Sequence, residues 1–322
     1  MIKQSDNEKN KKAATAEKGI ALLMTLWVLT IMMVLVLSFS YMTRTETYAT
    51  LSFKEGMEKK FLAEAGIERG ILELFYRNAN KNQAILLEGH EVWRIDGRPY
   101  KDLMGEGEFS VGITDESGKI DINAMTDGGS DIILRNLLKN LGVQEEETNT
   151  IVDSILDWKD ADDAHHLSGA EDEYYMSLPN PYKAKNANFD TLEELLLVKG
   201  ITSEILYGNK EKKGIINLLT IYSNKIQINI NAAPKEVLMA IPGITPEIAD
   251  SIISFREHDE IKNAAEVGIL PGIKYVTLGD SYTYTIDSSG IKGNAKTGFK
   301  IRATVKIEGV NNYRYLYYKS PA

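Results

Sequence analysis

The chain has 322 residues, 43% of them hydrophobic and 26% charged, which are ordinary values for a folded protein and exclude both general disorder and many membrane spans. The formal net charge is −9, and residues 1–19 hold five Lys against three acidic residues, so the remainder is more acidic still and would be repelled by nucleic acid. Cysteine is absent, which excludes disulfides, thiolate metal sites and Cys nucleophiles.

The N-terminal segment has the features of a membrane helix behind a basic leader. No charged residue occurs from Gly19 to Thr43, and this run is long enough to cross a hydrocarbon core of about 30 Å. A secretory signal peptide is the alternative, but the run is longer than a typical one and no small-residue cleavage site follows it. We therefore expect a leader over 1–19, a transmembrane helix over 20–43, a cytoplasmic N-terminus and an external body.

The helical pattern continues beyond the apolar run. Residues 57–78 keep apolar side chains close to a 3.6-residue period, among them Phe61, Ile67 and Ile71. No Pro interrupts residues 20–78. One long helix is expected, and its second half should pack on a globular domain.

The junction between leader and helix resembles that of the type IV pilin superfamily. In that superfamily a basic leader ends in Gly and a hydrophobic helix follows, as Lys18 and Gly19 precede the apolar run from Ile20 to Leu23 here. The resemblance implies cleavage by a prepilin peptidase after Gly19, with Ile20 as the methylated first residue of the mature chain. The fifth mature residue is Met24 where most pilins have Glu, a departure that resembles the K-type minor pseudopilins of type II secretion.

The body predicts a sheet that is interrupted by a helical region. Apolar residues alternate over 107–123, which indicates strands, and a mostly helical region extends from about 127 to 275. Other strands are predicted where Tyr, Val, Ile and Thr are frequent, over 91–97, 281–288, 299–309 and 313–319. We expect an α+β protein with a pilin-like fold, a long N-terminal helix packed on an antiparallel sheet, formed by 44–126 and 276–322 with 127–275 inserted.

The insertion contains an internal repeat. The sequence IDINA at 120–124 recurs as ININA at 228–232, and IVDSILDWKD at 151–160 matches IADSIISFRE at 248–257. Short apolar-x-Gly-apolar turns occur in both copies, as VKGI at 198–201, IPGI at 241–244 and LPGI at 270–273. These features predict an all-α insertion built from two helix-hairpin-helix, or SAM-like, repeats.

Helix-hairpin-helix repeats leave a DNA-binding function open as the alternative. A membrane-tethered receptor for DNA uptake has the same arrangement of anchor and external domain. DNA-binding hairpins commonly have a second Gly that lets backbone N–H groups approach a phosphate, whereas this chain has Thr202, Thr245 and Lys274 at that position. Glu247 adds negative charge beside the second hairpin. We interpret the hairpins as packing units and expect no nucleic-acid partner.

The most acidic stretch is residues 157–173, which hold seven carboxylates and one Lys. Calcium takes six to eight oxygen ligands from such loops, although the spacing is not that of an EF-hand. A solvated acidic turn is the alternative. The chain has no nucleophile elbow, HExxH motif or Gly-rich phosphate loop, so we expect no enzymatic activity.

The order DWKDADD, GAEDEYY and NPY over residues 157–182 is similar to that of the K-type pseudopilins, whose helical domain binds calcium. The resemblance implies Ca²⁺ as cofactor and a pool of ligands within the acidic loop: Asp160, Asp162, Asp163, Glu171 and Asp172. His165 and His166 suit softer metals and are expected to be exposed.

The same resemblance implies a function in protein secretion. The chain would be a non-enzymatic subunit at the tip of the periplasmic pseudopilus, anchored in the inner membrane by its N-terminal helix. Its implied partners are the minor pseudopilins I, J and H, the major pseudopilin filament and the prepilin peptidase. The bulky insertion would cap the filament because it blocks further subunits from stacking.

Overall fold

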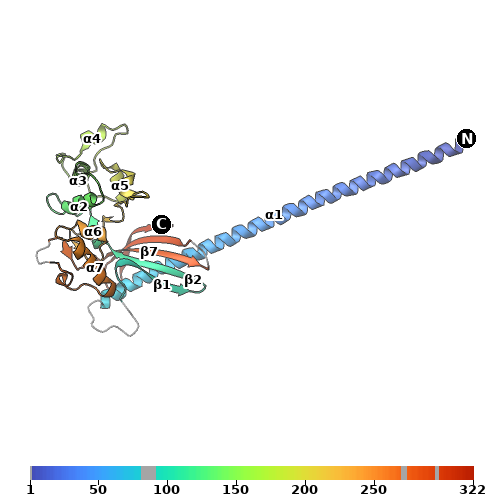
Figure 1. Ribbon diagram of the computed structural model, residues 1–322. Helices are drawn as coiled ribbons and strands as arrows, with labels where there is room; N and C mark the ends of the chain where they lie inside the picture. Colours follow the sequence, from blue (N-terminus) through green and yellow to red (C-terminus); the bar gives the residue numbers. More distant parts are fainter. Residues whose placement is uncertain (1, 81–91, 270–273, 294–296) are drawn as a thin grey trace. The chain divides into compact units, whose positions relative to one another are not determined.

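The computed structural model describes residues 2–80, 92–269, 274–293 and 297–322 (Figure 1). The chain divides into two compact units, Met1–Glu58 and Lys59–Ala322. A single helix, α1 (Ile2–Asn80), makes up the first unit and supplies its last turns to the second. From Gly19 onward this helix is long and apolar enough to cross a membrane, with a mean hydropathy of 2.8 in its apolar window, which fits the predicted anchor.

The second unit contains a five-stranded antiparallel sheet with the strand order β1-β2-β7-β8-β9. Side chains of β2 alternate between buried and half-buried along its whole length, as the apolar pattern of the sequence predicts. The predicted mixed α+β class and antiparallel sheet are confirmed. The strands are β1 (Asp96–Met104), β2 (Gly107–Asp115), β7 (Thr283–Lys292), β8 (Phe299–Ile307) and β9 (Tyr313–Lys319).

The last turns of α1 pack on one face of this sheet. Ala63, Ile67 and Ile71 are buried in one core with Val111 of β2 and Ile286 of β7. The face of the helix that packs on the sheet therefore does not include Phe61. Its side chain is 57% exposed, although its spacing in the sequence predicted a place in the core. The long helix packed on an antiparallel sheet agrees with the predicted fold class.

The first strand differs from the prediction. A strand was expected over 91–97, but β1 begins at Asp96, and residues 92–94 are not in a strand. Trp93 instead stacks on Tyr100 of β1, with ring centroids 4.4 Å apart, and the backbone N–H of Arg94 donates to the hydroxyl of Tyr100 at 2.8 Å. The aromatic and apolar residues before the strand thus cover it rather than form it.

The insertion leaves the sheet after β2 and returns to it at β7, and its helices gather beyond one end of the strands (Figure 1). Its helices are α2 (Asp131–Asn140), α3 (Glu145–Lys159), α4 (Asp172–Met176), α5 (Ser203–Tyr207), α6 (Lys235–Ala240) and α7 (Pro246–His258). Short 3₁₀ helices are η1 (Glu116–Gly118), η2 (Leu192–Leu197) and η3 (Ala264–Val267). Two-residue strands are β3 (Ile120–Asp121), β4 (Leu219–Thr220), β5 (Ile228–Asn229) and β6 (Val276–Thr277).

The repeat seen in the sequence is also a repeat in structure. In the first copy β3 pairs in parallel with β4, and in the second β5 pairs in parallel with β6. Lys159 of α3 donates to the carbonyl oxygens of Asn123 and Met125, and Arg256, at the matching place in α7, donates to Ile230 and Ala233. Each copy therefore uses one cation to cap the loop after its first short strand.

The hairpin turns of the repeats depend on glycine. Gly200 and Gly243 have φ angles of 85° and 91°, a backbone region that side chains with a Cβ disfavour. The third turn, LPGI at 270–273, lies outside the described residues.

Candidate metal centre

Three potential metal ligands meet where α3 ends. Asp157 lies in the last turn of α3, Asp160 is the residue that caps its C-terminus, and His166 belongs to the loop that follows. Ligand atoms of these three residues all lie within 4.8 Å of one another. The acidic loop therefore folds back on the helix from which it starts.

Asp157 organises this loop from a fully buried position. Its Oδ1 accepts from the backbone N–H of His166 at 3.0 Å and from the ring Nδ1 of the same residue, while its Oδ2 accepts from the backbone N–H of Ala170 at 2.7 Å. A Cβ on Gly169 would lie only 1.8 Å from Asp157 Oδ2. The close approach of loop and carboxylate thus requires glycine at residue 169.

Two neighbouring carboxylates have buried oxygens without hydrogen-bond donors. Within the described part of the chain, Oδ1 of Asp160 and both carboxylate oxygens of Glu171 have no partner. Glu171 is only 5% exposed, so bulk solvent has little access to its carboxylate. A buried carboxylate without donors is costly unless a cation neutralises it. Three orphaned carboxylate oxygens fit an oxygen-seeking ion such as Ca²⁺.

The charges of the cluster also shift the pKa values of its members. Burial, followed by the charges of Asp157 and Asp160, raises the pKa of Glu171 to about 7. Burial and the neighbouring acids likewise raise the pKa of Asp160. Although burial alone lowers the pKa of His166, its hydrogen bond to Asp157 and the surrounding carboxylates raise it overall. A cation bound here would compete with the protons that these raised pKa values favour.

The nearby lysines do not supply that charge. Lys159 is directed to backbone carbonyl oxygens, and burial lowers its pKa. Lys199 donates to the carbonyl oxygen of Gly169 at 2.9 Å, which holds the loop from the other side. Both ammonium groups bind backbone carbonyl oxygens around the site, and neither donates to Oδ1 of Asp160 or to the carboxylate of Glu171.

The ligands expected from the sequence have different surroundings. Asp160 and Glu171 belong to the buried cluster, whereas Asp162 and Asp163 are exposed on the loop, where Oδ1 of Asp162 accepts from the backbone N–H of Ala164 at 2.9 Å. The carboxylate of Asp172 accepts from Lys183 at 2.7 Å and from the backbone N–H of Ala184 at 2.9 Å. Lys183 thus already neutralises Asp172, which is half-exposed and lies outside the ligand set proposed below.

Sequence reasoning missed Asp157 and His166. Asp157 lies four residues after Asp153 on a helix whose neighbouring positions are apolar, and an acid at such a buried position was the available signal. His165 is exposed as expected, but His166 is half-buried and hydrogen-bonded to Asp157.

The raised pKa of Glu171 gives a pH prediction for the metal-free protein. With a chelator present, the free energy of unfolding should fall as the pH rises from 4.5, the ordinary pKa of Glu, to about 7. In this window the native state keeps a proton that the unfolded state has lost, so rising pH favours unfolding. Urea titrations at several pH values should show that the free energy of unfolding of the Glu171→Gln variant falls less steeply with pH than that of the wild type. An equal pH dependence in wild type and variant would contradict the raised pKa of Glu171.

The second hairpin has surroundings that oppose phosphate binding. Thr245, which follows the turn, accepts at its hydroxyl from the backbone N–H of Ile248 at 3.3 Å, and Glu247 lies in the first turn of α7. Lys235 of α6 forms an ion pair with Asp250 of α7. The N-terminus of α7 is therefore capped by the side chain of Thr245 and carries the negative charge of Glu247, both of which disfavour a bound phosphate.

Comparison with known proteins gives two family matches in the insertion. Residues 117–207 match the family described as type II secretion system (T2SS), protein K. This region contains the whole candidate metal centre. Residues 223–279, the second repeat, match the helix-hairpin-helix motif.

Individual relatives and one solved structure agree with these matches. Type II secretion system protein K of Klebsiella pneumoniae is 26% identical over 241 residues, 71% of each chain. The protein of the same name from Pseudomonas aeruginosa is 29% identical over 61% of this chain and 60% of its own length, less than two thirds. The fold is similar to a chain of the GspK-GspI-GspJ complex from enterotoxigenic Escherichia coli, with a TM-score of 0.56, 17% identity and coverage of 86% of this chain and 98% of that one. The chain is thus similar to type II secretion system protein K over most of its length, and the family model of that protein matches the part of the insertion that holds the candidate metal centre.

Proposed function

We propose that this protein is a non-enzymatic minor pseudopilin at the tip of the type II secretion pseudopilus, where it helps to initiate and cap the filament and supports protein export across the outer membrane. The observation that carries this proposal is the family match over the insertion, together with a pilin-like arrangement of α1 on an antiparallel sheet. The buried carboxylates are explained by a structural cation and require no reaction.

The proposed location is the inner membrane, with a cytoplasmic N-terminus and a periplasmic body. The uncharged run of α1 and the Lys residues before it support this orientation. We also propose that the chain is cleaved between Gly19 and Ile20 and that Ile20 is methylated. The intact mass of the membrane-extracted chain would report both changes directly. Met24 in place of the usual Glu is suited to a subunit that has no neighbour above it.

The insertion supports the capping role. It lies between two adjacent strands of the sheet, so its helices form a bulky addition at one end of the pilin-like body (Figure 1). The proposed partners are the minor pseudopilins I and J, with H and the major pseudopilin below them in the filament. The similar chain of known structure belongs to a complex of three such subunits, which supports this choice.

Calcium is the proposed cofactor of the insertion. Asp157, Asp160 and Glu171 would hold the ion, with Asp162 and Asp163 available on the same loop. Bound Ca²⁺ would neutralise the carboxylates and fix the loop to the end of α3. Nucleic acid is not a proposed partner because the body is acidic and the second hairpin is capped internally.

Co-expression tests the assembly. The full chain, extracted in detergent after co-expression with pseudopilins I and J of the same secretion system, is expected to copurify with both. An unrelated pilin of similar size, expressed in the same way, should not be retained. A processed, folded chain that purifies alone would contradict the proposed function.

A further inference from the structure

The insertion is joined to the sheet at two places that lie side by side. Its first residue follows Asp115 at the end of β2, and the chain returns through Ser281 to β7. In the sheet Asp115 is paired with Tyr284 of β7. Two adjacent connections alone would leave a domain of this size able to swing relative to the sheet, so its orientation has to be set by other contacts.

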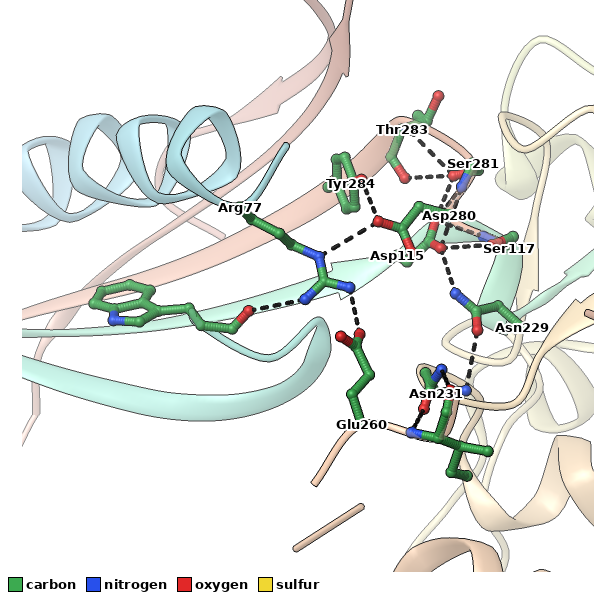
Figure 2. Close-up of polar contacts among 12 residues, drawn as sticks. Arg77, Asp115, Ser117, Asn229, Asn231, Glu260, Asp280, Ser281, Thr283 and Tyr284 are labelled. Atoms are coloured by element: carbon green, nitrogen blue, oxygen red, sulfur yellow. Dashed lines mark hydrogen bonds and ion pairs between the residues drawn. The ribbon is translucent and has the colours of Figure 1, made fainter. Parts of the chain in front are cut away.

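Asp115 supplies such contacts from a fully buried position (Figure 2). Its Oδ2 accepts from the hydroxyl of Ser117 at 2.6 Å and from Nδ2 of Asn229 at 2.9 Å. Its Oδ1 accepts from the hydroxyl of Ser281, and the backbone N–H of Ser281 lies 3.2 Å from both oxygens. One carboxyl group thus binds the departing segment, the returning segment and the first strand of the second repeat.

The carboxyl group is held by dipoles, because no cation of the described chain forms an ion pair with it. Arg77, near the end of α1, pairs instead with Glu260 and with Asp280, whose Oδ2 is 3.4 Å from Arg77 Nε (Figure 2). Glu116 of η1 is the other acid beside Asp115 in the chain, and it is bound to Lys119. Burial, opposed by the hydrogen bonds from Ser117, Ser281 and Asn229, raises the pKa of Asp115.

The returning segment is strained at the same place. Tyr282 has a φ of +61°, a left-handed backbone conformation that residues with a Cβ disfavour. The kink is held on both sides: Ser281 by Asp115, and the carbonyl oxygen of Tyr282 by the backbone N–H of Ile307 at 2.8 Å. Such strain persists where the surroundings over-determine the backbone. The junction therefore depends on the contacts of Asp115 to keep its shape.

Arg77 adds a link from the helix. Its guanidinium is buried and joins α1 to Glu260, which follows α7, and to Asp280, which precedes β7, while Nη1 donates to the carbonyl oxygen of Trp93. The end of α1, the approach to β1 and both sides of the insertion are tied at one point. An axial displacement of this part of α1 would thus be passed to the insertion as well as to the sheet.

We propose that Asp115, Asn229 and Ser281 form an orientation clamp that, with Arg77, makes the inserted helical domain and the pilin-like sheet a single rigid body. Asn229 is its decisive member on the side of the insertion, because it is the only described residue of the second repeat whose side chain is hydrogen-bonded to Asp115. This inference goes beyond the proposed function and does not depend on it, since the clamp lies within one chain.

The test measures orientation rather than stability alone. The chain has no Cys, so Lys101→Cys on β1 and Lys210→Cys in the insertion, both exposed positions, allow two nitroxide labels to be attached to the full chain in detergent. Pulsed electron resonance should give one narrow distance distribution in the otherwise wild-type chain. Asn229→Ala should broaden it, because the variant removes the contact between Asp115 and the second repeat and leaves only Arg77 to restrain the insertion on its two connections.

Asn231→Ala is the matched control. Asn231 exchanges two hydrogen bonds with the backbone of Ile261, and both residues lie in the second repeat. This variant should lower the melting temperature of the chain yet leave the distance distribution narrow. A narrow, unchanged distribution in folded Asn229→Ala would overturn the proposal, as would equal broadening in both variants. Circular dichroism on the labelled samples establishes that each variant is folded.

Discussion

Calcium is expected to raise the melting temperature of the purified full chain by roughly 5–15 °C over its value in chelator. An ion present at 100 to 1,000 times its dissociation constant stabilises the native state by about 3–4 kcal/mol, and each kcal/mol shifts a domain of this size by about 2–4 °C. The physical basis is the set of buried carboxylate oxygens on Asp160 and Glu171 that lack donors. Differential scanning calorimetry with calcium and with chelator measures the shift.

Two substitutions locate the ion. Glu171→Gln should remove most of the calcium shift, because an amide cannot supply the charge that two buried oxygens provide. Asp172→Asn is the matched control, since its carboxylate is already bound by Lys183 and by the backbone of Ala184, and should keep the shift. Loss of the shift in Asp172→Asn with retention in Glu171→Gln would place the ion on the outer side of α4 instead.

A third substitution leaves every ligand in place. The Cβ of Gly169→Ala would overlap Oδ2 of Asp157, so either the loop or the carboxylate has to move. Calcium affinity should therefore fall by at least tenfold, which corresponds to about 1.4 kcal/mol. Calorimetric titration gives this value, and an unchanged affinity would show that Asp157 does not organise the site.

Much of the fold could be predicted because its signals are local. The apolar alternation over 107–115 and the Tyr-rich run over 313–319 coincide with β2 and β9. β1 was misplaced because it is an edge strand: residues 101–104 are exposed, so no alternation marks them. The aromatic residue that looked like part of a strand, Trp93, covers the strand from outside.

The polar sites were harder to predict because they join segments far apart in the sequence. Asp115 occupies the last inward position of an alternation that includes Phe109, Val111 and Ile113, and an acid in that register predicts a buried carboxylate. Its partners Asn229 and Ser281 are more than a hundred residues away, and no local pattern identifies them. The acidic loop shows the same limit, since the carboxylates that converge could be told from those that face outward only in three dimensions.

Substitution of Gly290 by Val is expected to destabilise the second unit by about 3 kcal/mol or more. This value lies at the upper end for overpacking, because the added side chain would meet backbone atoms of α1 rather than a flexible side chain. A Cβ at this position of β7 would lie 2.2 Å from the carbonyl oxygen of Lys59 and 2.6 Å from the backbone nitrogen of Ala63, both on α1. Neither atom can turn away as a flexible side chain could. The helix would have to lift from the sheet and lose contacts of Ile67 and Ile71 with the core.

Two controls separate this close approach from a general effect of losing glycine. A Cβ at Gly56, in the exposed part of α1, would meet nothing within 4 Å, so Gly56→Ala should stabilise the helix by about 0.5–1 kcal/mol. Gly279→Ala should be nearly neutral, since its nearest neighbour is 3.5 Å away. Urea unfolding of the three variants, followed by circular dichroism, gives the free energies. If Gly290→Val matches wild type, the packing of α1 against β7 described here is wrong, and with it the pilin-like core on which the proposed assembly depends.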